Sequence, residues 1–200
     1  MKTIRLAIIL LSFVPDIFGQ KMDTIQVLFL YGSRPVHGYW HKESHYFGGF
    51  HGGHVSVVMD SFVIGFRHVK GLHVIPKRKH DGGSYINEKL KDFVKDTIAS
   101  KYTSFKVPIT HEQYQNLNNI FQAYIDKTPY DYAFLGMRCA SATYEVLSYI
   151  GLFKIKSRCG NIISNFYPKL FRKKMFALAK EKNWKISRQP GRKTRKWEMD

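Results

Sequence analysis

The sequence lacks the short motifs that identify several classes of enzyme site. It contains no HExxH segment, no glycine-rich phosphate loop and no nucleophilic serine in a GxSxG elbow. These absences argue against a zincin-type metal centre, a nucleotide-phosphate cradle and an α/β-hydrolase nucleophile. Internal repeats and low-complexity tracts are also missing, so repeat architectures are not expected.

Long apolar runs are scarce as well. The apolar run at 6–14 is too short to span a bilayer, which takes about 20 residues. It follows Lys2 and Arg5 and precedes Pro15 and Gly19, a layout typical of a secretory signal peptide. We therefore expect residues 1–20 to be a signal peptide and the protein to be exported, either periplasmic or secreted. An uncleaved amphipathic anchor is the alternative.

Acidic residues are few. The chain has 15 of them against 32 lysines and arginines, a formal net charge of +17. Twelve lysines and arginines and three acidic residues lie within 169–200. Such a field attracts polyanions or anionic surfaces. Because export makes nucleic acid a poor partner, we expect a phosphate-rich envelope or lipid headgroup surface, or a basic face that only aids solubility.

About 180 residues remain after the signal peptide, enough for one domain with a sizeable core. The hydrophobic pattern and turn residues predict strands at 24–32, 54–60, 62–69, 72–76 and 104–109, a polar loop at 77–84, and helices at 86–98, 110–127, 139–150 and 168–183. Thr110 and Gln113 have the spacing of a capping box before an apolar helix face, and Gly151 suits the end of the helix that begins at Cys139. A two-residue turn at Asp60-Ser61 would place Met59 opposite Phe62 and His54 opposite Arg67. We expect a domain over 21–168 and a basic helix and tail over 169–200.

Cys139, one of only two cysteines, begins a predicted helix. A helix start lowers a thiol pKa through unpaired N–H groups and the helix dipole. A nucleophilic thiol also needs a base, normally a histidine. His54 is the best candidate, because it opens an apolar strand directly after Gly52 and Gly53, where a substrate can approach closely. We expect Cys139 to face His54, to carry a depressed pKa, and to be alkylated before Cys159.

The segments GGHVSVVMD and, some 85 residues later, PYDYAFLGMRCASATYEVL together resemble the circularly permuted NlpC-type papain-like group. This group includes bacterial envelope hydrolases and relatives of lecithin:retinol acyltransferase. The resemblance covers about residues 24–151 and implies an α+β, papain-like fold with an antiparallel sheet packed against helices. It matches His54 to the strand histidine and Cys139 to the nucleophile.

The sequence departs from the group at the third polar residue, which orients the histidine. Gly65 or Phe66 occupies the expected position, and neither can serve. His68 and His73 lie nearby, but neither shares the face of His54 unless a bulge intervenes. We choose His73 as the third catalytic candidate.

Other side chains complete the expected site. Tyr130, Asp131 and Tyr132 precede the cysteine helix and are predicted, with Gly52 and Gly53, to line the substrate cleft. Zinc ligands are available at His37, His41, Glu43, His45 and His51. Without a further pairing motif, we interpret that stretch as an aromatic loop and predict neither metal nor cofactor.

Three functions remain open at this point. The leading hypothesis is an exported thiol amidase, peptidase or acyltransferase that acts on an envelope peptide, an isopeptide or a lipid ester. The second is a catalytically inactive copy of the same fold that binds anionic envelope polymers or surfaces. The third is a structural protein stapled by a Cys139–Cys159 disulfide. The sequence does not predict an oligomeric state.

Overall fold

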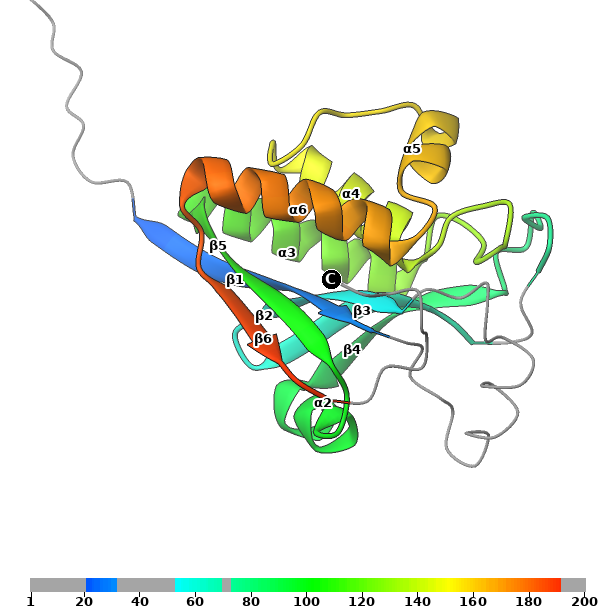
Figure 1. Cartoon of the computed structure of the whole chain (residues 1–200). Helices are drawn as coiled ribbons and strands as arrows, with labels where there is room; N and C mark the ends of the chain where they lie inside the picture. Colours follow the sequence, from blue (N-terminus) through cyan, green and yellow to red (C-terminus); the bar gives the residue numbers. More distant parts are fainter. Residues whose placement is uncertain (1–20, 32–52, 70–72, 192–200) are drawn as a thin grey trace, which may run out of the picture.

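A computed structural model of the chain describes residues 21–31, 53–69 and 73–191. Along the chain its elements are β1 (Met22–Leu30), β2 (His54–Met59), β3 (Phe62–His68), β4 (Gly83–Lys89), α2 (Leu90–Thr97), β5 (Tyr102–Thr110), α3 (His111–Asp126), α4 (Cys139–Tyr149), α5 (Arg158–Ser164), α6 (Pro168–Lys182) and β6 (Ile186–Gln189). The strands form one six-stranded antiparallel sheet in the order β4-β3-β2-β1-β5-β6 (Figure 1). The predicted α+β class with an antiparallel sheet is therefore confirmed.

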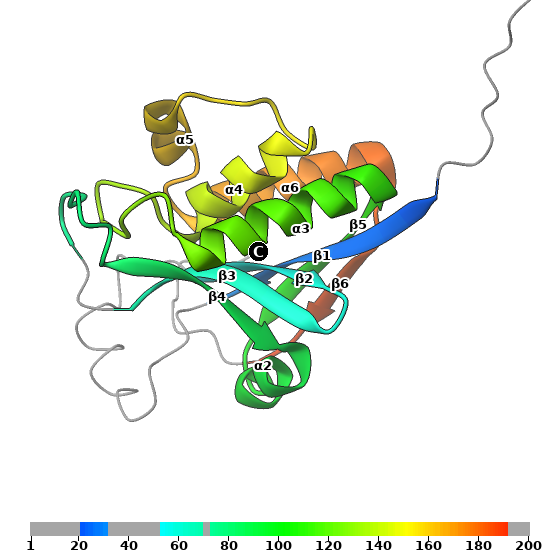
Figure 2. The ribbon, with the colours of Figure 1, turned by 180° about the vertical axis from the view of Figure 1, so that it is seen from behind.

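Helices cover the two faces of the sheet unequally. Helices α3, α4 and α6 lie together on one face, and α2 lies on the other, as the two opposite views show (Figures 1 and 2). Successive strand residues point to opposite faces, so Val55 and Val57 join the main core while Val58 joins a smaller cluster with Phe93 of α2. This alternation decides on which side of the sheet each functional side chain lies.

The hairpin of β2 and β3 has the register that the Asp60-Ser61 turn predicts, with Met59 opposite Phe62. Two neighbouring predictions are wrong. Of the strand predicted at 72–76, the described residues 73–76 form none: His73 makes an isolated bridge to Ala133, and the three residues after it are in no strand. The partner of β3 is instead β4, which occupies residues assigned to a loop and to a helix start. Strand β4 pairs along the whole of β3, and its Tyr85 side chain is buried. This pairing outweighs the local helical pattern that begins at residue 86.

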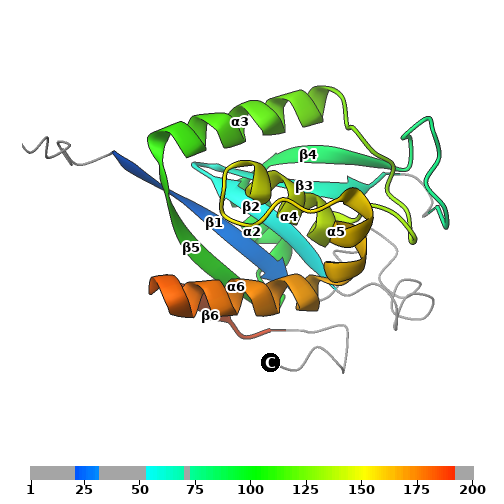
Figure 3. The same cartoon turned by 90° about the horizontal axis from the view of Figure 1, so that it is seen from above.

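The boundary expected between residues 168 and 169 does not separate two packing units. Phe171, Met175 and Ala179 of α6 belong to the main core, and β6 extends the sheet by pairing with β5. Helix α6 runs beside α4 above the sheet (Figures 1 and 3). The described chain from β1 through β6 is thus built around one main core.

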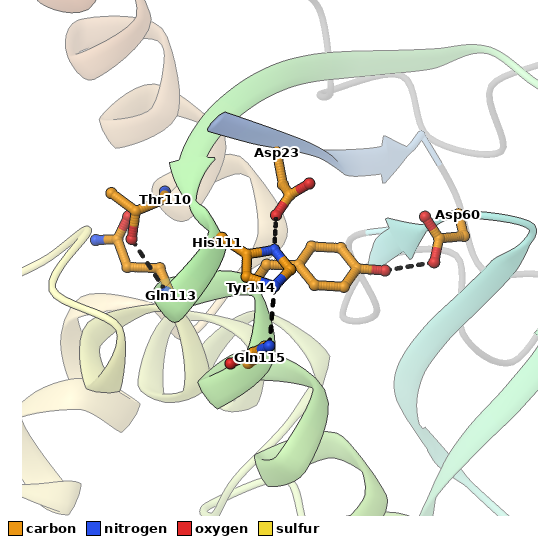
Figure 4. Close-up of polar contacts among 7 residues, drawn as sticks. All are labelled: Asp23, Asp60, Thr110, His111, Gln113, Tyr114 and Gln115. Carbon is orange, nitrogen blue, oxygen red and sulfur yellow. Dashed lines mark hydrogen bonds and ion pairs between the residues drawn. The ribbon is translucent and has the colours of Figure 1, made fainter. Parts of the chain in front are cut away.

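The start of α3 is tied to the sheet by polar contacts (Figure 4). His111 Nδ1 lies 2.7 Å from a carboxylate oxygen of Asp23 in β1, and the Tyr114 hydroxyl donates to Asp60 in the β2–β3 turn. Thr110 and Gln113 form the capping box that the sequence predicts. These contacts fix the helix against the edge of the hairpin.

The Thr110→Ala variant should lower the free energy of unfolding by about 1 kcal/mol, because the Gln113 backbone N–H loses its cap acceptor. For a chain of this size we expect the melting temperature to fall by about 2–4 °C. Thermal denaturation followed by circular dichroism measures the shift. Thr110→Ser keeps the acceptor and is the control; an equal loss in both variants would contradict the capping role.

Several predictions fall outside the described residues. These are the signal peptide at 1–20, the histidines at 37, 41, 45 and 51, Gly52, and the tail after residue 191. Among the residues that the structure does describe, no helix is both long and apolar enough to cross a membrane.

Candidate functional site

Cys139 is the first residue of α4, as the sequence predicts, and its side chain is buried. The thiol points at the start of β2, where Sγ lies 4.0 Å from the carbonyl oxygen of Gly53. Gly53 has a φ of +70°, a left-handed conformation that suits glycine and turns the chain into β2 beside the sulfur. Both Cys139 and Cys159 are free thiols, and the disulfide left open by the sequence is not formed.

Opposing influences act on the Cys139 thiol. Burial raises its pKa, and this cause outweighs those that act in the opposite direction. The groups that favour the thiolate are the backbone N–H of Val55, the positive charge of Arg138, the hydroxyl of Tyr132 and the backbone N–H of Ala140. The expected depressed pKa is therefore wrong for this structure, because loss of hydration exceeds the help of a helix start.

Tyr132 lies at the centre of the surroundings of the thiol. Its hydroxyl acts to lower the pKa of Cys139, and burial raises the pKa of Tyr132 well above its usual range, so the hydroxyl stays protonated. The rings of Tyr132 and His68 are 5.7 Å apart. His68 is exposed at the end of β3, but the loss of hydration on its packed side lowers its pKa, so the neutral ring predominates at neutral pH. Tyr132 therefore lies next to both the thiol and the His68 ring.

His54 does not face Cys139, and the predicted pair is wrong. In the sheet His54 is opposite Leu30, a member of the small cluster on the α2 face, whereas Cys139 packs in the main core on the other face. The His54 Nε2 atom accepts from Arg67 Nε at 3.4 Å. A Cβ built on Gly65 would lie 3.0 Å from that same nitrogen, so the ring lies over β3. Strand alternation places the sheet between His54 and the thiol.

His73 does not orient His54 either. Its Nδ1 atom lies 2.6 Å from the Asp131 carboxylate, which also accepts from the backbone N–H groups of Lys77 and Gly82. Burial acts to raise the pKa of Asp131, but the two amides and the His73 ring more than offset it, so the net pKa is lowered. The contact instead fastens the loop after β3 to the segment before α4.

Within the described ranges, one group of three side chains has metal-ligating atoms close together. His73, Asp81 and Asp131 each offer an atom, all within 4.8 Å of one another. The Asp131 carboxylate already accepts three hydrogen bonds, which a cation would have to displace in part. A fixed histidine–carboxylate pair accounts for this arrangement without a metal ligand role.

Some of the other residues predicted to line the substrate cleft lie in the core, and some lie beside the thiol. Tyr130 is buried, and its hydroxyl pairs with the hydroxyl of Tyr85. Arg138 is also buried, with its guanidinium 3.7 Å from the centroid of the Phe166 ring and hydrogen-bonded to the Phe166 carbonyl oxygen. Tyr132 and Gly53 are thus the predicted lining residues that adjoin the thiol, whereas Tyr130 lies in the core and Asp131 binds His73.

The prediction from the sequence chose His54 for the cysteine side of the sheet, although the alternation of side chains along β3 indicates His68. The regular register of β3 puts His68 on the same face as Phe66, and Phe66 packs against Tyr132 at a ring distance of 5.0 Å. The alternation that sets His68 apart from His54 therefore also places it with the cysteine helix. Burial of the thiol had no such signal, since it depends on packing between α4 and β2.

The site thus combines a buried helix-start thiol with three kinds of donor and a neutral histidine on the same face. Comparison with protein-family models, curated protein sequences and solved structures finds no match to this chain.

Proposed function

We propose that this chain is an exported thiol-dependent hydrolase or acyltransferase with Cys139 as its nucleophile. The observation that supports the proposal is the polar and positive environment of one buried sulfur at a helix start. The backbone N–H groups of Val55 and Ala140, the Tyr132 hydroxyl and the Arg138 charge all act to lower the pKa of this thiol. A cysteine that only fills a core needs apolar neighbours, whereas reactive cysteines occupy electropositive surroundings.

In this proposal the thiol is protonated at rest, because burial raises its pKa. His68 is neutral and lies on the cysteine side of the sheet, so it is the candidate base in place of His54. The sulfur attacks an acyl carbon, an S–C bond forms, and the proton removed from the thiol passes to the leaving nitrogen or oxygen as its bond to carbon breaks. Water or an acceptor alcohol then cleaves the thioester.

The substrate class stays that of an envelope peptide, an isopeptide or a lipid ester. The resemblance to the permuted papain-like group, in which a histidine-bearing strand precedes the cysteine helix, supports this choice, and here β3 with His68 precedes α4 in the chain. Backbone N–H groups at the start of α4 are suited to hold an oxyanion. Membership of that group is part of the proposal.

The test is acyl-enzyme trapping in a Cys159→Ser background, which removes the exposed thiol. Short-chain p-nitrophenyl esters are the probe, and mass spectrometry of the quenched protein locates the acyl group. We expect acylation of Cys139, slowed about 10²-fold by His68→Gln, the usual lower range for loss of a general base. His54→Gln is the matched control on the other face and should change the rate by less than about threefold.

Two outcomes would contradict the proposal. If Cys139 is not acylated at any pH at which the protein stays folded, the thiol is a packing residue. If His54→Gln slows acylation and His68→Gln does not, the base has been assigned to the wrong face. The melting temperature of each variant is measured as well, so that a loss of acylation caused by a folding defect is recognised.

A second candidate function is supported by the orientation of His54 and by the buried thiol. An inactive member of the same fold would bind an anionic envelope polymer or surface through its basic residues and would not need a nucleophile. Absence of acylation together with retained binding to anionic envelope fractions would favour this candidate.

A further inference from the structure

A basic surface lies on the side of the molecule that faces away from the sheet. The loop after α4 and helix α5 form the outermost layer there, beyond α4 and α6 (Figures 1 and 3). Residues 151–191 contain eleven lysines and arginines but a single acidic residue, Glu181. Glu181 pairs with Lys182 at the far end of α6. The charge around α5 itself therefore has almost no counter-charge nearby in the sequence.

Two lysines from different elements meet at one residue. Lys156 Nζ donates to Ser164 Oγ at 3.0 Å, and Lys174 Nζ donates to the Ser164 carbonyl oxygen at 2.8 Å and to Asn165 Oδ1 at 2.6 Å. Both ammonium groups lie over the Tyr144 ring, at 5.7 and 5.2 Å from its centroid. Partial burial, and secondarily the charge of Lys156, lower the pKa of Lys174 to about 8. Two like charges held together in this way favour a bound anion.

Large aliphatic side chains are exposed between these lysines. Ile155 is 62% exposed and lies between Lys154 and Lys156, and Ile163 is 69% exposed and precedes Ser164. The contact of Lys156 with Ser164 brings the two isoleucine-bearing segments together. A soluble polyanion would bind the lysine ammonium groups but would leave the isoleucine side chains in water. An anionic bilayer interacts favourably with both kinds of side chain, since basic residues bind headgroups while aliphatic side chains enter the interface.

We propose that the α5 surface, formed by Lys154, Ile155, Lys156, Ile163 and Lys174, docks on a membrane that contains anionic phospholipids. The phosphate of a headgroup binds between Lys156 and Lys174, and the two isoleucines insert to the depth of the headgroup and acyl boundary. This role is independent of the thiol chemistry. It brings the protein to a lipid surface whether or not Cys139 is a nucleophile.

Helix α2, on the opposite face of the sheet, provides a built-in comparison. It also exposes two aliphatic side chains, Val94 and Ile98, at 50% and 72%. Its two lysines, Lys91 and Lys95, are offset by Asp92 and Asp96, so its net charge is zero. Apolar exposure alone therefore does not distinguish α2 from α5, whereas apolar exposure with unbalanced positive charge does.

The test is co-sedimentation of the full chain with phosphatidylcholine vesicles, with and without about one third phosphatidylglycerol. We expect binding only to the anionic vesicles. Lys154→Gln with Lys156→Gln should weaken it roughly 30-fold, because each lysine near an anionic surface contributes to binding. Ile155→Ser with Ile163→Ser should weaken it about tenfold while leaving the charge unchanged. All four residues are exposed, so the fold should be retained.

The controls are the corresponding pairs on α2, Lys91→Gln with Lys95→Gln and Val94→Ser with Ile98→Ser, each with an expected loss below about threefold. Cys139→Ala should bind vesicles like the unchanged chain, even if it abolishes acylation. Equal losses from the two lysine pairs would overturn the proposal, because net charge alone would then explain binding. Full vesicle binding by the isoleucine variant, with equally tight binding to inorganic polyphosphate, would overturn it as well, in favour of a soluble polyanion.

Discussion

Replacing Phe171 with alanine is expected to lower the free energy of unfolding by about 3–5 kcal/mol, the usual cost of deleting a buried aromatic side chain. Phe171 is fully buried, and its ring lies 5.4 Å from that of Phe29, 5.7 Å from that of Tyr144 and 5.5 Å from that of Phe153. It therefore joins α6 to β1 and to α4. Urea denaturation measures the loss, and the melting temperature should fall by about 6–20 °C.

The neighbouring residue provides the control for this variant. Leu170 is on the same helix but 38% exposed, so Leu170→Ala should cost less than about 1 kcal/mol. If Phe171→Ala costs no more than Leu170→Ala, α6 is a separable basic extension, and the domain boundary predicted at residue 168 would be supported. A large difference supports one cooperative unit that includes α6.

Alkylation of the native protein at neutral pH is expected to modify Cys159 at least about tenfold faster than Cys139, because the Cys139 thiol is buried and its raised pKa keeps it protonated. Cys159 is exposed, whereas Cys139 is 3% exposed. This order is the reverse of the one predicted from the sequence. Iodoacetamide labelling followed by peptide mass spectrometry gives both rates in one sample, and labelling in denaturant should remove the difference.

The rate of Cys139 labelling is expected to increase with pH into the alkaline range, because the buried surroundings of the thiol raise its pKa. Burial raises the thiol pKa above its ordinary value of 9.0, so the labelling rate should keep rising to beyond pH 9 in the folded protein. The Tyr132→Phe variant removes a hydroxyl that favours the thiolate and should move the curve further to alkaline pH. Labelling of Cys139 below neutral pH would contradict the buried geometry and would indicate a preformed thiolate.

Local signals in the sequence were enough for several elements. The capping box of Thr110 and Gln113, the apolar face that follows it, and the two-residue turn at Asp60-Ser61 predict α3 and the hairpin correctly. The helix at Cys139 ends at the glycine that the sequence indicates, Gly151, with a φ of +81°. These features depend on neighbours within a few residues, which is why a single sequence contains them.

Other features depended on partners far along the chain. Residues 86–89 belong to the helix predicted over 86–98, but they pair with the open edge of β3 as part of β4. Strand β6 forms because β5 offers it an edge, and α5 is held at Ser164 by lysines on either side of it. Backbone pairing with a distant strand outweighs weak local propensity, so these elements were missed.

For the candidate site, the sequence by itself determined that a cysteine begins a helix and that a histidine begins the strand beside it. Only the tertiary structure decided that the two side chains lie on opposite faces of the sheet, and that His68 and Tyr132 are on the side of the thiol. The physical reason is the two-residue period of a strand: one position of register moves a side chain from one face to the other. Motif spacing along the chain does not encode that choice, and neither does it encode the burial that raises the pKa of Cys139.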